Sequence, residues 1–450
     1  MKFEDINRIY FLGIGGIGMS AIARYFNSKG IKISGYDKTP TPLTSKLISE
    51  GIEIHFEEDV AQIPSDVDLV VLTPAIPKNH KELIYFQENN FKILKRSEIL
   101  GIITKNTFTI AIAGTHGKTS VTSLVSHILN EANLNIAAFI GGISQNYGSN
   151  IILHNDSNIT VVEADEFDRS FLTLHPDLAV ITSMDADHLD IYKNKENLHE
   201  SFNQFASQIK KGGKLFVNEG LEKYINAEIE VLTYGVYTNS RFYATNIRAE
   251  GGFYTFDFSG NDIIKGIKPG SAAYYNVINS IPAIAIAKAM GVENDVIKKA
   301  LNNYQGVKRR FEYIINTENL VFIDDYAHHP TEIEACIKSV RNLFENRKVT
   351  GIFQPHLFSR TKDFADGFAE ALSKLDEVIL LDIYPARELP IEGVTSKMLL
   401  DKIDNPKKFL FTKEELIRKI GAWDLDVLLT IGAGDIDALI EPIKNELLKK

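Results

Sequence analysis

A short segment in the first half of the chain combines glycine, lysine and threonine at the spacing of a phosphate-binding loop. The segment reads FTIAIAGTHGKTSVTSLV and covers residues 108–125, with a predicted strand before the glycines and a predicted helix after them. Open backbone N–H groups at a helix N-terminus favour phosphate, a lysine reaches the terminal phosphates, and a threonine hydroxyl can hold Mg²⁺. We therefore expect ATP and Mg²⁺ to bind at Gly114, Thr115, His116, Gly117, Lys118, Thr119 and Ser120. The full P-loop pattern has a glycine in place of Ile112, so a turn without a ligand stays an alternative.

Two runs of acidic residues follow predicted buried strands further along the chain. Residues 158–168, NITVVEADEFD, deliver Glu163 and its acidic neighbours, and residues 178–183 lead into MDADHLD, which contains His188. A strand that ends in carboxylates, downstream of a phosphate loop, is where an ATPase places a metal ligand. Carboxylate oxygens suit Mg²⁺, and an imidazole suits a second metal site. Either run alone would be better explained as a solvated loop that caps the next helix, but two such runs beyond a GKT loop favour a metal site.

A glycine-rich turn stands near the N-terminus. The sequence GIGGIG at residues 13–18 lies between a predicted strand at residues 9–12 and a predicted helix, and Asp37 follows the next strand. This is the spacing of a dinucleotide fingerprint, which alone would suggest a NAD-type dehydrogenase. A nucleotide-sugar diphosphate fits such a turn equally well, and a tight turn without a ligand remains a third interpretation. The candidate binding residues are Gly15, Gly16, Ile17, Gly18 and Asp37.

The last third of the chain places histidines and arginines after predicted strands. The segments are DDYAHHPTE, QPHLFSRT, YPARE and GAGD, at residues 324–332, 354–361, 384–388 and 432–435. Strand carboxyl ends face the ligand crevice of a doubly wound sheet. Arginine binds carboxylates and phosphates with two parallel hydrogen bonds, so these loops suit recognition of either group.

The order of predicted elements indicates an α/β protein with three domains. We expect a Rossmann-like N-terminal domain at residues 1–104, a central P-loop ATPase-like domain at residues 105–307 and a C-terminal Rossmann-like, doubly wound domain at residues 308–450. Residues 99–106 are a predicted linker, and the polar, basic residues 306–311 mark the second boundary. Residues 214–260 are predicted to form a small antiparallel appendage, and residues 269–289 a helix that carries Asn276 and Asn279.

Composition limits the class of protein. The chain has 450 residues, a formal net charge of −10 and 24% charged residues, so we expect neither nucleic-acid nor membrane binding. Its one cysteine, Cys336, excludes a disulfide within the chain. The first ten residues lack the profile of a signal peptide, and no apolar run is long enough to span a membrane. These features predict a cytoplasmic protein, and we expect a monomer or a weak homodimer.

Taken together, the motifs resemble those of the Mur ligases, the amide-forming ligases of peptidoglycan synthesis. The strings GIGGIGMSAIA, GTHGKTS, EADEFDRSF, MDADHLD and DDYAHHPTE carry this resemblance, which covers essentially the whole chain. Family members have a short GTxGKT loop, which accounts for Ile112. The resemblance implies that Lys118 and Thr119 hold the ATP phosphates with Mg²⁺, that Glu163 binds this metal, and that His188 binds a second one. It also implies nucleotide contacts by Asn276, Asn279, Arg310, Asp325 and His329.

The resemblance further implies a reaction. The γ-phosphoryl group of ATP would activate the lactyl carboxylate of UDP-N-acetylmuramate, and the amine of L-alanine would displace the phosphate. His356 and Arg360, assisted by Arg387, would hold the carboxylate of the amino acid, and His188 is a candidate base. Three alternatives stay open: a recycling ligase that uses a preformed tripeptide, a NAD-dependent oxidoreductase that leaves the GTHGKT loop idle, and a nucleotide-binding regulator without catalysis.

Overall fold

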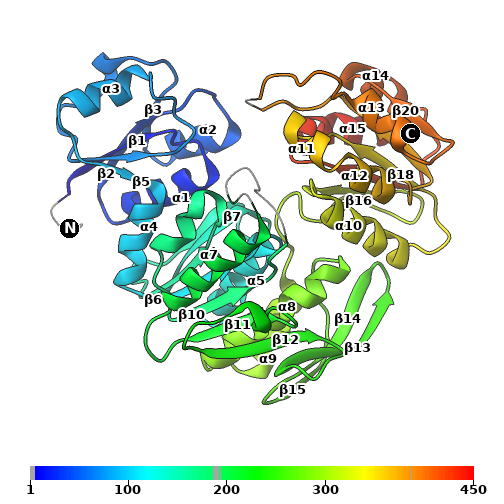
Figure 1. Cartoon of the computed structure of the whole chain (residues 1–450), viewed down its shortest axis with the longest axis horizontal. Coiled ribbons are helices and arrows are strands. Elements are labelled where there is room, and N and C mark those ends of the chain that lie inside the picture. The colour runs from blue at the N-terminus through cyan, green and yellow to red at the C-terminus, as the bar shows by residue number, and fades with distance from the viewer. Residues whose placement is uncertain (1–5, 186–191, 193, 387, 450) are drawn as a thin grey trace. The chain divides into compact units, whose positions relative to one another are not determined.

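The computed structural model describes residues 6–185, 192, 194–386 and 388–449, without the side chain of Asp168 (Figure 1). The chain divides into two compact units. One contains Met1–Tyr243, Phe258–Ile263 and Asn279–Ala300, and the other contains Ala244–Asp257, Ile264–Ile278 and Leu301–Lys450. Within the described residues no helix has both the length and the apolar composition that crossing a membrane requires.

The N-terminal sheet belongs to the first unit and has the strand order β3-β2-β1-β4-β5, with all neighbouring strands parallel. In β1, Ile9 and Phe11 face one apolar core while Tyr10 and Leu12 face another, so both sides of the sheet are covered. The strands are β1 (Arg8–Leu12), β2 (Lys32–Tyr36), β3 (Glu53–His55), β4 (Leu69–Leu72) and β5 (Ile93–Lys95). The helices are α1 (Ile17–Ser28), α2 (Pro42–Ser49), η2 (Val60–Gln62), α3 (Lys81–Glu88) and α4 (Arg96–Lys105).

The predicted linker at residues 99–106 is wrong, because most of it lies in α4. Ile99, Leu100 and Ile103 are buried on one face of this helix. Their spacing of one and three residues is that of an amphipathic helix. At the start of the helix, the backbone N–H of Lys95 donates to Oε2 of Glu98 at 2.7 Å. A short helix with a buried face therefore replaces the expected linker.

The central sheet carries the phosphate loop. In the first unit its strand order is β12-β11-β10-β6-β9-β7-β8, and only the β7–β8 pair is antiparallel. Because Ile112 in β6 pairs with Glu163, and Ala113 pairs with Ile181 of β10, the carboxyl ends of three strands meet at one edge. The strands are β6 (Phe108–Ala113), β7 (Ile136–Ser144), β8 (Ser149–Leu153), β9 (Ile159–Glu163), β10 (Leu178–Ile181), β11 (Lys214–Asn218) and β12 (Glu230–Val236). The helical segments are α5 (Lys118–Glu131), η3 (Phe167–Thr173), α7 (Lys195–Ser207), η4 (Glu222–Tyr224), α8 (Tyr274–Ala289) and α9 (Asn294–Asn303).

The predicted antiparallel appendage begins later than expected. β11 and β12 extend the central sheet as parallel strands, which contradicts the prediction for this part of residues 214–260. Three consecutive residues of β11, Leu215, Phe216 and Val217, are buried, and this is typical of a parallel strand covered on both faces. Only β13 (Phe242–Glu250), β14 (Phe253–Ser259) and β15 (Ile263–Ile267) form the appendage, where Gly251 and Gly252 make the tight turn of a hairpin.

The C-terminal sheet belongs to the second unit. Its strand order is β16-β17-β21-β18-β19-β20, in which only the unpredicted edge strand β16 is antiparallel to its neighbour. Two consecutive helices, Phe358–Asp363 and Ala365–Leu372, are separated only by Phe364. The strands are β16 (Glu312–Asn316), β17 (Val321–Asp325), β18 (Val349–Phe353), β19 (Glu377–Leu380), β20 (Lys408–Leu410) and β21 (Val427–Ile431). The helices are α10 (Pro330–Leu343), α11 (Phe358–Asp363), α12 (Ala365–Leu372), α13 (Ser396–Lys402), α14 (Lys413–Ile420), η5 (Asp435–Leu439) and α15 (Ile440–Leu447).

Candidate active site

The phosphate loop between β6 and α5 has a backbone conformation that glycine adopts without strain. Gly114 has a φ of +131°, and Gly117, which is the N-cap of α5, has a φ of +81°. A Cβ atom on Gly117 would lie 2.9 Å from Oδ1 of Asn279, so a larger residue would also clash. Because glycine has no side chain with which to cap the helix, the first N–H groups of α5 face the loop as an anion-binding end.

The end of β10 holds this loop in place. The backbone N–H of Thr115 donates to the carbonyl of Ser183 at 3.1 Å, and the N–H of His116 donates to the Ser183 hydroxyl at 2.8 Å. The hydroxyl of Thr182 donates to the carbonyl of His116. Thr119 and Ser120, in the first turn of α5, are buried. The loop is therefore fixed by a strand that is distant in the sequence.

Lys118 is bound to a buried carboxylate. Its Nζ lies 2.7 Å from Oε2 and 3.0 Å from Oε1 of Glu166, whose side chain is fully buried, and it also donates to the carbonyl of Gly114 at 2.7 Å. Burial by itself lowers the pKa of Lys118, but the charge of Glu166, with smaller effects of two further acids, raises this pKa well above its usual value. The ammonium group is therefore charged and held at the mouth of the loop.

Glu163 stands at the end of β9, where a metal ligand was expected. Its Oε2 accepts a hydrogen bond from the backbone N–H of Gly141 at 3.1 Å. A Cβ atom on Gly141 would overlap this carboxylate, so glycine lets the Glu163 side chain lie against β7. Together with the hydroxyl of Thr119, the Glu163 carboxylate offers the hard oxygen atoms that Mg²⁺ prefers.

The second acidic run is only partly described. Asp185 lies 3.6 Å from Nε2 of His116, and its backbone N–H donates to the hydroxyl of Thr115 at 3.1 Å. His188, with the neighbouring Asp187 and Asp190, lies outside the described residues. Among the residues that are described, no three histidine, cysteine or acidic side chains come together as a metal cluster.

The N-terminal glycine turn follows β1 as predicted from its spacing. Oδ2 of Asp37 accepts a hydrogen bond from the N–H of Gly15 at 2.7 Å, so the acid at the end of β2 braces the turn itself. Gly16 is the N-cap of α1, which begins at Ile17. Sequence reasoning missed Arg96, whose Nη1 lies 2.7 Å from where a Cβ of Gly18 would be. Arg96 directly follows β5, and the rule that ligands bind at strand carboxyl ends could have identified it.

The two predicted asparagines of α8 have different surroundings. Asn279 lies beside Gly117 of the phosphate loop in the first unit. Asn276, in the second unit, donates from Nδ2 to the hydroxyl of Ser271 at 2.7 Å and is buried. The position of Asn279 suits a contact to a nucleotide in the loop, whereas Asn276 supports the start of its own helix.

In the C-terminal domain, Asp325 ends β17 as a buried acceptor. Its carboxylate accepts hydrogen bonds at 2.8 Å from the Tyr275 hydroxyl and from the N–H groups of Phe311 and Ala327. Burial raises the pKa of Asp325, and the nearby Arg310 opposes this rise. The guanidinium of Arg310 lies 5.1 Å from the centre of the Tyr326 ring. Both predicted residues are thus at the same strand end.

The histidines predicted in this domain lie near one another at the carboxyl ends of β17 and β18. His356 stacks on Tyr384 with ring centres 5.8 Å apart, and its ring centre is 6.5 Å from that of His328. Burial lowers the pKa of His328 to about 4, with Glu332 opposing this effect, so its imidazole is neutral at neutral pH. His329 caps α10 by accepting a hydrogen bond from the N–H of Thr331 at 3.3 Å.

Arg360 lies in the short helix α11, close in sequence to His356. Its charge contributes to the low pKa of His328, so the guanidinium lies within electrostatic range of that ring. The preceding residue, Ser359, donates from its N–H to Oε2 of Glu388 at 3.0 Å, which ties α11 to the loop after β19. Arg387, the third predicted amino-acid ligand, lies outside the described residues.

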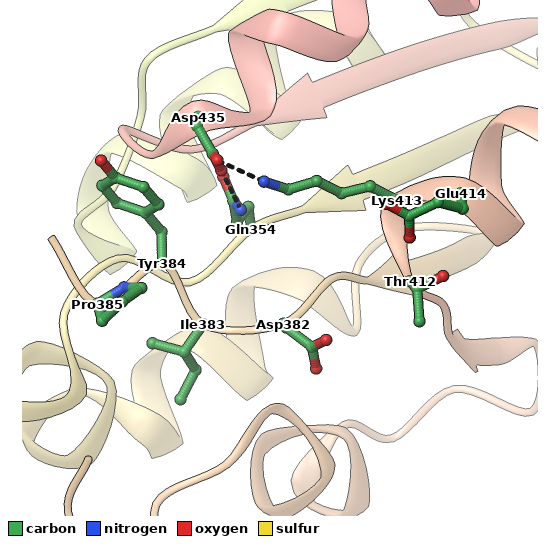
Figure 2. A pocket seen from close by; sticks show the side chains of 9 residues that line it. All are labelled: Gln354, Asp382, Ile383, Tyr384, Pro385, Thr412, Lys413, Glu414 and Asp435. Carbon is green, nitrogen blue, oxygen red and sulfur yellow. Dashed lines mark hydrogen bonds and ion pairs between the residues drawn. The ribbon is translucent and has the colours of Figure 1, made fainter. Parts of the chain in front are cut away.

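A cavity of about 400 Å³ opens at the carboxyl edge of the same sheet (Figure 2). Asp435 lines this cavity, and its carboxylate oxygens lie 2.5 Å from Nζ of Lys413 and 2.9 Å from Nε2 of Gln354. Tyr384, which stacks on His356, forms another part of the wall. The lining residues are Gln354, Asp382, Ile383, Tyr384, Pro385, Thr412, Lys413, Glu414 and Asp435. Sequence reasoning found three of the four loops here, but it missed the one at Lys413, which follows the short strand β20.

Comparisons with known families match most of the chain in three consecutive parts. The family described as "Mur ligase family, catalytic domain" matches residues 8–107, "Mur ligase middle domain" matches residues 112–287, and "Mur ligase, glutamate ligase domain" matches residues 309–434. The chain belongs to the Mur ligase family. This family uses ATP, so the predicted ATP dependence is confirmed at the level of the family.

Relatives of this Mur ligase match over the full length. It is 51% identical to the UDP-N-acetylmuramate--L-alanine ligase of Flavobacterium johnsoniae, over 99% of each chain, and 52% identical to the enzyme of the same name from Flavobacterium psychrophilum, over 100% of each chain. The crystal structure of a UDP-N-acetylmuramate-alanine ligase from Thermotoga maritima is 26% identical, covers 98% of this chain and 99% of its own, and has a TM-score of 0.82. The predicted three-domain α/β fold is therefore confirmed.

A more distant structure shows the same fold with another name. The murein peptide ligase of Psychrobacter arcticus is 22% identical to this Mur ligase, covers 98% of each chain and has a TM-score of 0.72. At this identity the likeness concerns the fold alone.

Proposed function

We infer that this Mur ligase joins L-alanine to the lactyl carboxylate of UDP-N-acetylmuramate and converts ATP to ADP and phosphate. The reaction is that of a UDP-N-acetylmuramate--L-alanine ligase and serves peptidoglycan synthesis. The observation that carries this inference is an identity of 51% over 99% of the chain to a relative of that name. The phosphate loop, with Lys118 charged and buried, supports the use of ATP.

Two steps account for the chemistry. First, an oxygen of the lactyl carboxylate attacks the γ-phosphorus of ATP, the bond to the β-phosphate oxygen breaks, and ADP leaves. The resulting acyl phosphate has a good leaving group, which a free carboxylate lacks. The neutral amine of L-alanine then attacks the acyl carbon, and phosphate leaves with the former carboxylate oxygen as the amide forms. The amine releases a proton, for which His188 is our candidate acceptor if its imidazole is not fully used as a metal ligand.

We assign the phosphoryl-transfer roles to the central domain. Lys118 binds the β- and γ-phosphates, with the N–H groups from Gly114 to Ser120 around them. Thr119 and Glu163 would hold Mg²⁺, and His188 would hold a second ion. When bound, Mg²⁺ neutralises charge on the transferred phosphoryl group. The hydrogen bond from Gly141 to Glu163 supports this assignment, because metal-binding carboxylates are typically oriented in this way.

The remaining predicted residues keep their proposed roles. Asn276, Asn279, Arg310, Asp325 and His329 would contact the nucleotide. The Asp325 carboxylate already accepts three hydrogen bonds. A contact to the nucleotide would therefore use other lone pairs of its two oxygen atoms. The diphosphate of the nucleotide sugar would bind at Gly15, Gly16, Ile17 and Gly18, with Asp37 bracing the turn. The carboxylate of L-alanine would bind at His356, Arg360 and Arg387.

Four further proposals concern the whole protein. We propose domain limits at residues 1–104, 105–307 and 308–450, a monomer or weak homodimer, and a cytoplasmic location. The location follows from the substrates, because ATP and nucleotide sugars are cytoplasmic metabolites. We propose neither nucleic-acid nor membrane binding, in keeping with the formal charge of −10.

The choice of acceptor tests this function. The purified protein is mixed with ATP, Mg²⁺ and UDP-N-acetylmuramate, and phosphate release is measured with L-alanine, with a tripeptide and without an acceptor. We expect stoichiometric phosphate and an alanyl product only with L-alanine. Turnover with the tripeptide alone would instead support the recycling activity, and no turnover with either would contradict a ligase of this substrate.

A further inference from the structure

We propose that Glu166 is a positioning residue for ATP binding, a latch that holds Lys118 until the phosphates of ATP draw the lysine away. The proposal rests on the proposed function only in that ATP binds at the loop of Gly114 to Ser120. It concerns a residue that the sequence placed among three neighbouring acids without a role of its own.

The hydrogen bonds of Lys118 show what the phosphates of ATP must displace. Both carboxylate oxygens of Glu166 lie within 3.0 Å of the Lys118 ammonium nitrogen. The third close partner of this ammonium group is the carbonyl oxygen of Gly114, at 2.7 Å. Three donors of an ammonium are thus directed at acceptors of the protein. To donate to a β- or γ-phosphate, Lys118 must give up at least one of these bonds. Glu166 and the phosphates therefore compete for the same ammonium group.

Glu166 is held in a fixed position. Its backbone carbonyl accepts hydrogen bonds from the hydroxyl of Tyr192 at 2.6 Å and from the N–H of Arg169 at 2.9 Å, and its side chain is fully buried. A carboxylate that is anchored in this way cannot follow Lys118 far when the lysine moves. By contrast, Glu163 is directed toward Gly141, so the two acids have separate tasks.

Burial explains why such a latch is needed. The Lys118 side chain is only 14% exposed, and an ammonium without a partner in such a place would be strongly destabilised. Glu166 supplies that partner before ATP arrives. Because Glu166 competes for Lys118, ATP binds less tightly than it would to a lysine without this partner. The same competition weakens the binding of ADP and so favours its release after the reaction.

A double-mutant cycle on ATP affinity tests the latch. The dissociation constant of Mg-ATP is measured without the sugar substrate for the unsubstituted protein, for Glu166→Gln, for Lys118→Ala and for the double variant. We expect Glu166→Gln to tighten ATP binding about tenfold, because a hydrogen bond between charged groups no longer competes. In the Lys118→Ala background the same change should have little effect, since the ammonium group for which Glu166 and the phosphates compete is absent. The factor by which Glu166→Gln changes the dissociation constant of Mg-ATP should therefore differ by about threefold or more between the proteins with and without Lys118.

Steady-state kinetics separate this role from a structural one. Glu166→Gln should lower both the KM for ATP and kcat, because ADP is also held more tightly. A folding defect would lower kcat and leave ATP affinity unchanged. Glu82→Gln serves as the matched control, since Glu82 is equally buried and binds Tyr10 and His55 in the N-terminal domain. It should leave ATP affinity unchanged.

Each other outcome contradicts a definite part of the account. Unchanged or weaker ATP binding by Glu166→Gln, or equal tightening with and without Lys118, would overturn the latch while the proposed function stands. Failure of the unsubstituted protein to bind ATP would overturn both. If Glu166→Gln does not fold, Glu166→Asp keeps the charge but withdraws it by one methylene group. It should tighten ATP binding to a smaller degree, and weaker binding would again overturn the proposal.

Discussion

Replacing Lys118 by alanine is expected to lower kcat/KM for ATP by about a thousandfold or more. Removal of one preorganised donor from a developing anion commonly costs about 10²–10³ in rate, and here the donor carries a full charge. The variant also leaves Glu166 buried without its cation, so some loss of stability is expected as well. The rate is measured as alanine-dependent phosphate release at saturating UDP-N-acetylmuramate.

A second lysine separates catalysis from folding. Lys210 belongs to the same unit and forms an ion pair of 2.8 Å with Asp177, but it lies outside the phosphate loop. Lys210→Ala should keep its kcat/KM near that of the unsubstituted protein. If Lys118→Ala, shown to be folded by its cooperative thermal transition, kept more than about a tenth of the activity, the assigned role of Lys118 in phosphoryl transfer would be wrong.

Replacing Gly141 by alanine is expected to raise the Mg²⁺ concentration for half-maximal activity by about 10- to 100-fold. This is the usual effect of losing a partner that orients a metal-binding group. The added methyl group would overlap the Glu163 carboxylate, so the side chain must turn away and lose the N–H donor at 3.1 Å. Activity is measured over a Mg²⁺ titration at constant Mg-ATP.

Gly421→Ala is the matched glycine substitution. A Cβ at Gly421 meets its nearest neighbour, the carbonyl oxygen of Glu446, at an ordinary distance of 3.6 Å, so the Mg²⁺ dependence should not change.

High Mg²⁺ should restore much of the activity of Gly141→Ala. A loss of activity that no Mg²⁺ concentration restores, or an unchanged titration, would contradict the assignment of Glu163 as a metal ligand.

The parts of the site that sequence reasoning found are those encoded by short patterns. The loop from Gly114 to Ser120 carries its glycines, lysine and hydroxyls within a few residues, and the strand predicted before it is β6. Asp37 was found because an acid follows the second strand at the spacing of the fingerprint. In such cases the chemistry and the local backbone conformation depend on the same neighbours in the sequence.

The contacts that sequence reasoning missed depend on residues far apart in the chain. Glu166 reaches Lys118 across 48 residues, and Gly141 reaches Glu163 across 22. Such partners are known only after the register of the strands is known. For the same reason β11 was mistaken for part of an antiparallel appendage, because nothing within its five residues shows which strand it pairs with.

The α4 helix was missed for a different reason. Its apolar residues Ile99, Leu100 and Ile103 have helical spacing, but the helix has only ten residues and lies where a domain boundary was expected. A short helix repeats its apolar pattern over few turns, so its sequence gives a weak signal. Packing against the core then decides its structure. The burial of all three side chains shows that tertiary contacts outweighed the weak local signal.

The most direct test of the account follows one oxygen atom. UDP-N-acetylmuramate is labelled with ¹⁸O in its lactyl carboxylate and converted with ATP and L-alanine, and the phosphate, ADP and any AMP are examined by mass spectrometry. If the carboxylate is activated by phosphoryl transfer, one labelled oxygen appears in the inorganic phosphate, and ADP is the nucleotide product. Label in AMP would show activation by adenylation instead, and phosphate without label would contradict the acyl phosphate.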